Sequence, residues 1–212
     1  KKTRKKVKIR VIDRLITALI IILIVLVTIL IMYGALRLYI KYNSIKVVDR
    51  INQINIYDEN NKYPEISSIE LEEEKTNDEI SYFGYNAIGA IYVPKINISY
   101  PILDTLNSTT MKIGAVRAYG ANLNDVGISI LVSHNYMDGS LFSNISKLTN
   151  GDSIFITDTS GKRVEYVVYS TFITDPKDTS YYNLNTDGKS QIALATCTND
   201  LKNEFIVLAK EK

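Results

Sequence analysis

The pattern of apolar and polar residues divides the chain into one long apolar stretch and a later series of short apolar runs. Residues 15–36 form a run of 22 positions without an ionisable acid or base, and only Thr17, Thr28 and Gly34 fall outside the apolar residue types. At about 1.5 Å per residue, a helix of this length spans roughly 33 Å, enough for a hydrocarbon core of about 30 Å. The run exceeds a signal-peptide core and no cleavage site follows it, so we predict an uncleaved transmembrane signal anchor.

The pattern changes after this apolar run. Residues 37–56 keep apolar residues at intervals of three to four positions, a spacing that predicts a helical stalk. Residues 57–81 are polar and acidic, which indicates a solvated linker, with a calcium site or an active-site lid as alternatives. We therefore expect a stalk and acidic linker over 37–81, followed by a folded domain over 82–212.

The folded domain carries short runs rich in β-branched residues, and Gly, Asn, Asp and Pro separate them. Many short strands between turn residues are typical of a small β-barrel or β-sandwich, so the predicted class is mainly β. One segment, 140–148, places Leu141, Ile145 and Leu148 on one helical face and predicts a short helix. The eight predicted strands cover 88–93, 98–103, 113–116, 127–133, 153–158, 163–174, 191–196 and 205–210.

The formal net charge of +2 conceals an uneven distribution along the chain. Residues 1–14 contain eight Lys or Arg and one acid, residues 15–50 contribute +3, and residues 51–212 therefore carry −8. The excess of positive charge before the apolar run predicts a basic cytoplasmic tail, a single-pass anchor in the cell membrane and an extracytoplasmic domain. Because an acidic domain repels phosphates, we expect no nucleic-acid partner.

Candidate chemistry is limited by the presence of one cysteine and one histidine. Cys197 follows the apolar run SQIALAT and His134 follows GISILVS, so each residue begins a loop where a predicted buried strand ends. These counts exclude an intramolecular disulfide, cysteine-rich zinc clusters and multi-histidine zinc sites, and we expect neither a metal nor a cofactor. Taken separately, a lone Cys or His is more often a structural residue.

The shared position of these two residues favours a functional interpretation. If strands 127–133 and 191–196 are parallel neighbours, Cys197 and His134 face each other across one interstrand spacing of about 5 Å. The 57 residues between these strands are ample for the crossover that parallel pairing requires. An imidazole beside a thiol favours the reactive thiolate, so the pair is a candidate for nucleophilic catalysis.

Residues 88–103, 129–156 and 193–200 carry a resemblance to one family, the sortases, which are membrane-anchored cysteine transpeptidases of Gram-positive cell surfaces. ALATCTND at 193–200 resembles the TLxTC segment of that family, with Ala193 where the motif has Thr. SILVSHNYMDGSLFSNISKLTNGDSIFI at 129–156 resembles the family's strand, His and following helix, with Ser133 in place of the usual Gly. IGAIYVPKINISYPIL at 88–103 resembles the opening hairpin. The three segments occur in the family's order.

This resemblance implies a closed eight-stranded β-barrel with short helices, preceded by the transmembrane helix. It implies that Cys197 attacks an LPxTG-type sorting signal to form a thioacyl enzyme, while His134 acts as general acid and then base. Thr196 would line the substrate groove. The implied partners are surface proteins or pilins with a C-terminal sorting signal, and an amine acceptor from a peptidoglycan precursor or a pilin lysine.

One position departs from the family pattern. Sortases carry an Arg near the start of the strand after the Cys, but this sequence has Glu204 there and no Arg after Arg163. Lys202 or Arg117 could supply the missing positive charge, the loop could align differently, or catalysis could be impaired. The alternative functions are therefore a cysteine peptidase that acts by hydrolysis and a catalytically impaired surface module with the same fold.

Overall fold

The structure is a computed structural model that describes residues 2–60 and 80–212, with side chains over 14–53 and 80–212. It comprises two compact units, Lys1–Tyr42 and Asn43–Lys212. Most of the predicted linker, together with its calcium-site and lid alternatives, lies outside the described residues.

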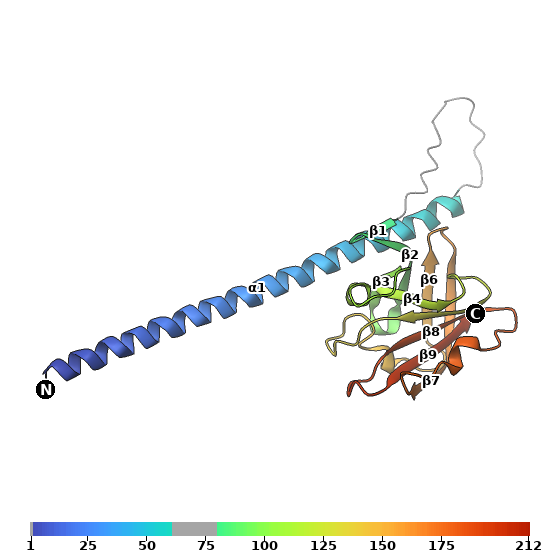
Figure 1. The fold of residues 1–212 in the computed structure, drawn as a ribbon. Helices are drawn as coiled ribbons and strands as arrows, with labels where there is room; N and C mark the ends of the chain where they lie inside the picture. The colour runs from blue at the N-terminus through green and yellow to red at the C-terminus, as the bar shows by residue number, and fades with distance from the viewer. Residues whose placement is uncertain (1, 61–79) are drawn as a thin grey trace, which may run out of the picture. The chain divides into compact units, whose positions relative to one another are not determined.

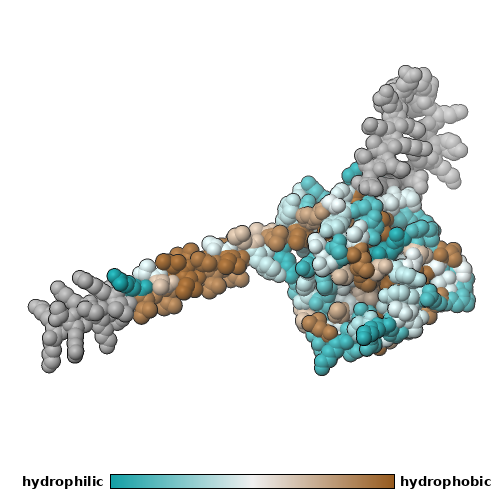
Figure 2. Space-filling model, in the orientation of Figure 1, coloured by the Kyte–Doolittle hydropathy of each residue, from teal (hydrophilic) through white to brown (hydrophobic). Residues whose placement is uncertain are grey.

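The predicted anchor and stalk form one continuous α-helix, α1 (Lys2–Asn60). Among the described residues, only the helical segment Arg14–Gln53 is long and apolar enough to cross a membrane. Large apolar side chains along 15–36 are exposed in the first unit, as the brown surface in Figure 2 shows. Such an apolar surface is compatible with insertion into lipid.

The last turns of α1 belong to the second unit and have a different environment. Val48 and Ile51 are buried there. The Thr157 hydroxyl also donates a hydrogen bond to Asn52 Oδ1 at 3.3 Å. This part of the predicted stalk therefore packs as an element of the folded domain.

The strands of residues 80–212 form a closed barrel with one added strand (Figure 1). The hydrogen-bonded order is β2-β3-β4-β5-β8-β9-β7-β6, and pairing of β6 with β2 closes the ring. Only the β3–β4 and β5–β8 pairs of this ring are parallel. The strands are β1 (Ile80–Tyr82), β2 (Tyr85–Val93), β3 (Ile98–Leu103), β4 (Ala115–Gly120), β5 (Gly127–Val132), β6 (Ser153–Asp158), β7 (Arg163–Thr174), β8 (Ser190–Cys197) and β9 (Glu204–Glu211).

The eight ring strands confirm the predicted mainly β barrel, with differences in detail. The strand predicted at 113–116 is shifted to β4, because charged Arg117 and the terminal Gly120 interrupt the apolar pattern that marks a strand in sequence. The short strand β1, which pairs with β2, was not predicted. Four short 3-10 helices connect the strands: η1 (Pro94–Ile96), η2 (Thr110–Lys112), η3 (Ile145–Lys147) and η4 (Ser180–Asn183).

The helix predicted at 140–148 is wrong except for η3. Leu141 has a φ of +51°, a left-handed conformation that interrupts a right-handed helix. The predicted face nevertheless exists, because Leu141, Ile145 and Leu148 are all buried. Turns and η3 together direct the three side chains inward without a regular helix.

Alternation of side chains along the strands creates two apolar clusters. The first receives residues from all eight ring strands, including Ile192 and Leu194 of β8, and fills the barrel interior. The second contains Ala193 and Ala195 of β8, together with residues of β5 and β9, and lies on the outer face under Tyr181 of η4. Continued alternation past Ala195 therefore directs Cys197 to the outer face.

Candidate active site

Cys197 is the last residue of β8 and is exposed to solvent. Seven consecutive buried residues precede it, so the rigid centre of the barrel positions the thiol. The turn that follows is closed by a hydrogen bond from the Thr198 N–H to the Asn203 carbonyl oxygen at 2.8 Å. The buried strand before Cys197 and the hydrogen-bonded turn after it thus fix the backbone position of this residue.

His134 lies two residues beyond the end of β5 and is partly buried. Its N–H donates to the Met111 carbonyl oxygen at 3.4 Å, and its carbonyl oxygen accepts from the Phe142 N–H at 3.2 Å. The imidazole lies near the Tyr136 ring, with centroids 5.5 Å apart. Its Nε2 atom is shielded from solvent and has no hydrogen-bond partner among residues 14–53 and 80–212. That nitrogen therefore remains available for a proton.

The predicted parallel pairing of these two strands is confirmed. β5 and β8 are in parallel register from Gly127 opposite Ser190 to Val132 opposite Ala195. The same offset continued by two residues places His134 opposite Cys197. The Thr196 hydroxyl donates to the Ser133 carbonyl oxygen at 2.8 Å, which ties the two chains together immediately before the pair.

The surroundings favour the uncharged forms of both side chains. Burial, assisted by the nearby positive charge of Lys112, lowers the pKa of His134 below its usual value. Burial and the negative charge of Glu204 raise the pKa of the Cys197 thiol. Both pKa directions therefore favour a protonated thiol beside an uncharged imidazole, a pair between which a proton can pass.

Glu204 is the residue found where the resemblance to sortases leads one to expect an Arg. It is the first residue of β9 and lies directly opposite Cys197 in the antiparallel β8–β9 pair. Burial raises the pKa of its carboxyl group, although the Tyr181 hydroxyl, which donates to Oε2 at 3.5 Å, acts in the opposite direction. A carboxyl group therefore adjoins the thiol at the start of β9.

The other predicted site residues lie around this pair in different ways. Thr196 is buried, and its hydroxyl donates a hydrogen bond to the Ser133 carbonyl oxygen, so it holds β8 against the end of β5. Lys202 is exposed in the turn between β8 and β9. Arg117 donates to Asn122 Oδ1 and the Ala121 carbonyl oxygen in the β4–β5 turn, at the opposite end of β5 from His134. Arg117 is therefore held away from Cys197.

Two residues near the pair were not anticipated. The Asn135 side-chain N–H groups donate to the Cys197 carbonyl oxygen and to Asn199 Oδ1, both at 2.9 Å, so they join the loop after β5 to the end of β8 and the turn that follows. Lys112 of η2 lowers the pKa of His134 electrostatically. Asn135 could have been noticed as the residue after His134, whereas Lys112 carries no local sequence signal.

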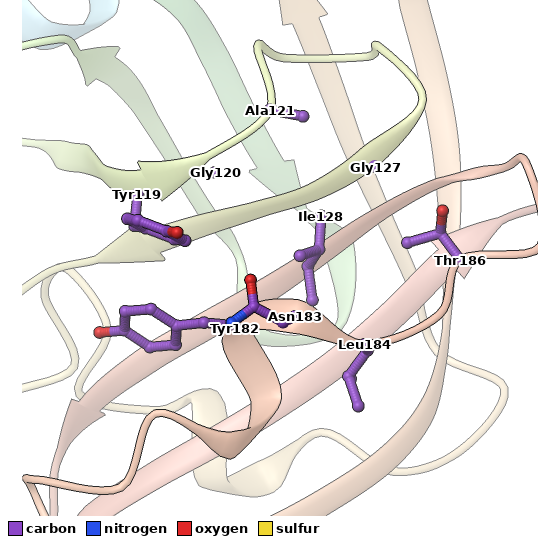
Figure 3. Close-up of a pocket in the computed structure, with 9 residues that line it drawn as sticks. All are labelled: Tyr119, Gly120, Ala121, Gly127, Ile128, Tyr182, Asn183, Leu184 and Thr186. Carbon is purple, nitrogen blue, oxygen red and sulfur yellow. The ribbon is translucent and has the colours of Figure 1, made fainter.

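A pocket of about 570 Å³ opens on the same outer face, near the start of β5. Figure 3 shows Tyr119 and Tyr182 at one end of it, with Ile128 and Leu184 on the adjoining walls. The two tyrosine ring centroids are 5.0 Å apart. His134 lies six residues beyond Ile128, roughly 20 Å at 3.3 Å per residue, so an extended peptide of several residues could connect the two places.

The ring order of the barrel and the Cys and His at neighbouring strand ends define a sortase-like β-barrel protein. The Sortase domain family matches residues 91–212, and the chain belongs to this family. Among curated proteins, the chain is 28% identical over 113 residues to sortase A of Bacillus anthracis, which covers 53% of this chain and 52% of that protein. The chain thus spans about half the length of that relative.

Solved structures of other sortases share the fold. A Clostridium perfringens sortase D5 transpeptidase has a TM-score of 0.57 and 24% identity, covering 81% of this chain and 97% of that one. A C. perfringens sortase C, solved with the C-terminal cell wall sorting motif, has a TM-score of 0.55 and 21% identity over 80% and 88% of the two chains. These comparisons confirm the sortase-like β-barrel predicted from the sequence.

Proposed function

We propose that this protein is a cysteine transpeptidase that cleaves an LPxTG-type sorting signal and transfers the acyl part to an amine. The observation that carries the proposal is the parallel register of β5 and β8, which brings Cys197 and His134 to adjacent strand ends. Family membership supports transpeptidation in general, and the exact signal and acceptor belong to the proposal.

In this mechanism, His134 accepts the proton of the Cys197 thiol as the sulfur attacks the carbonyl carbon of the scissile peptide bond. The C–N bond then breaks, and His134 returns the proton to the leaving amine. A thioacyl enzyme remains on Cys197. An acceptor amine attacks this thioester, a new C–N bond forms, the C–S bond breaks, and a proton passes through His134 to restore the thiol.

The pocket near the start of β5 provides a place for the peptide upstream of the scissile bond. Its tyrosine and aliphatic walls suit an apolar side chain, and backbone groups of Gly120 and Gly127 lie within it. Thr196 and Lys202 are assigned supporting roles: Thr196 joins the two strands, and Lys202 lies exposed in the turn between β8 and β9, five residues after Cys197.

The membrane arrangement is part of the same proposal. The exposed apolar helix would anchor the chain with its basic N-terminus in the cytoplasm and the barrel outside. There the barrel would meet surface proteins or pilins that carry a C-terminal sorting signal. Acceptors would be amines of peptidoglycan precursors or pilin lysines.

Intact-mass spectrometry of the full chain in detergent with an LPxTG peptide tests this proposal. A thioacyl adduct should form on Cys197, and a glycine peptide should convert it to an amide product. Cys197→Ala should abolish the adduct. His134→Ala should reduce its formation by several orders of magnitude, with stability preserved within about 1 kcal/mol. A cysteine peptidase would give hydrolysed product only, even with the glycine peptide present.

A catalytically impaired module is the competing interpretation, since Glu204 raises the pKa of the Cys197 thiol. It predicts no adduct with any sorting peptide. It also predicts that a methanethiosulfonate reagent labels Cys197 no faster in the native protein than in a denatured control. Both results together would overturn the enzymatic proposal.

A further inference from the structure

Glu204 lies in a row of three side chains across neighbouring strands. It pairs with Cys197 of β8 on one side and with Thr174 of β7 on the other. Directly opposed residues in antiparallel strands point to the same face, with Cβ atoms about 4.5–5.5 Å apart. The carboxyl group therefore lies on the outer face, next to the sulfur atom that would carry the acyl group.

The groups of β7 and η4 that the hydrogen bonds place near Glu204 are neutral or acidic, while Lys202, two residues before it, lies exposed in the turn. Tyr181 of η4 donates its hydroxyl to the carboxyl group, and Thr174 donates its hydroxyl to Asp178 Oδ2 at 2.5 Å. Hydrogen bonds from Thr174 and Ser180 lower the pKa of Asp178, so this second carboxylate stays ionised. Within residues 14–53 and 80–212, Glu204 forms no ion pair with a Lys or Arg. A partly buried carboxylate without a cation is costly, and a cationic ligand would relieve that cost.

The position of Glu204 has opposite effects on the two halves of the reaction. In the free enzyme, its negative charge opposes formation of the Cys197 thiolate. Once the sulfur is acylated it carries no charge, and this repulsion disappears. During the second half-reaction, the carboxylate would attract an ammonium group to the thioester. A residue that hinders the first step can thus serve the second.

We propose that Glu204 is the acceptor-binding residue, which holds the ammonium group of a primary aliphatic amine beside the Cys197 thioester and selects cationic acceptors. This inference rests on the proposed transpeptidase function. The bound ammonium loses one proton to solvent and becomes the nucleophile. Its nitrogen attacks the thioester carbonyl carbon, the C–S bond breaks, and the second proton passes to His134 and then to the departing sulfur. No other reactant is required.

The test compares wild-type full chain with Glu204→Gln, which removes the charge and retains the shape. Glu165→Gln is the matched control, because it removes the same charge near the start of β7, nine residues along that strand from Thr174. Each protein is first loaded with an LPxTG peptide and its Cys197 adduct is quantified. KM is then measured for two nucleophiles, a glycine peptide with a cationic amine and hydroxylamine, which is mostly uncharged at neutral pH.

Glu204→Gln should raise KM for the glycine peptide about tenfold, equivalent to about 1.4 kcal/mol. KM for hydroxylamine should stay unchanged, and Glu165→Gln should match wild type for both nucleophiles. An unchanged KM for the glycine peptide, or an equal rise for both nucleophiles, would overturn the inference. Loss of the adduct in Glu204→Gln, with adduct retained in wild type, would instead assign Glu204 to the first half-reaction.

Adduct formation by wild type and the salt dependence of KM separate the remaining explanations. Absence of an adduct in wild type would refute the proposed transpeptidase itself, before the acceptor is considered. If Glu204→Gln does not fold, the ionic-strength dependence of wild type replaces it, because salt screens an ammonium–carboxylate attraction. Rising salt should increase KM for the glycine peptide and leave that for hydroxylamine constant, and equal responses would contradict the inference.

Discussion

Gly120, at the end of β4, makes a close contact with β5 that a single methyl group should disrupt. Its φ is +92°, and a Cβ atom at this position would lie 2.0 Å from the carbonyl oxygen of Ile128. A left-handed conformation costs an L-residue roughly 1–2 kcal/mol. Because ordinary carbon–oxygen contacts are about 3.3 Å or longer, Gly120→Ala must also push the two strands apart by more than about 1 Å.

That displacement would break specific hydrogen bonds. The Ala121 N–H donates to the Ile128 carbonyl oxygen at 2.9 Å, and the Ser129 hydroxyl donates to the Ala121 carbonyl oxygen at 2.9 Å. Each such bond contributes about 1 kcal/mol. With the conformational cost included, we expect Gly120→Ala to lower the free energy of unfolding by roughly 3–4 kcal/mol.

Gly151 provides a matched control. Its φ is +93°, but no atom lies within 4 Å of the added Cβ position. Gly151→Ala should therefore cost only the conformational part, roughly 1–2 kcal/mol. Urea unfolding in detergent measures both losses through tyrosine fluorescence, since the chain has 15 Tyr and no Trp. Equal losses for the two variants would refute the close approach of β4 and β5.

Two further predictions concern the site and the core. Lys112→Gln removes a positive charge that lowers the pKa of His134. The acid limb of the pH profile for peptide cleavage should therefore move to higher pH, and an unmoved limb would contradict the electrostatic role of Lys112. Tyr166→Phe leaves the buried partners Asn124 and Ser190 without the tyrosine hydroxyl. It should lower the free energy of unfolding by roughly 1–3 kcal/mol, measured by thermal unfolding. The control Tyr92→Phe, at an exposed position, should change it by less than about 0.5 kcal/mol.

The features that could be predicted from the sequence are those with a local signal. Buried strands such as 127–133 and 191–196 are rich in apolar residues, and Cys197 and His134 directly follow their ends. The apolar run of 15–36 likewise identifies a helix without reference to any other part of the chain. Register could be proposed for β5 and β8 because both chemically distinctive residues sit at equivalent strand ends.

The features that could not be predicted depend on contacts between distant residues. Leu141 has good helix propensity, yet its left-handed backbone is imposed by the loop that carries His134 to the site. The role of Lys112 depends on η2 packing beside His134 through the Met111 carbonyl oxygen. Asn135 reaches Cys197 across a sequence separation of 62 residues. None of these contacts leaves a periodic pattern in the sequence.

Because the candidate site depends on the parallel contact between β5 and β8, we expect it to assemble late in folding. The long crossover between these strands must collapse before they can pair, and closing such a loop costs chain entropy without an early local reward. β8 is also flanked by β9, which itself pairs with β7, so the thiol reaches its final surroundings only as the ring closes. A partly folded chain therefore lacks the arrangement in which Cys197 lies opposite both His134 and Glu204, and this arrangement appears only together with the tertiary structure.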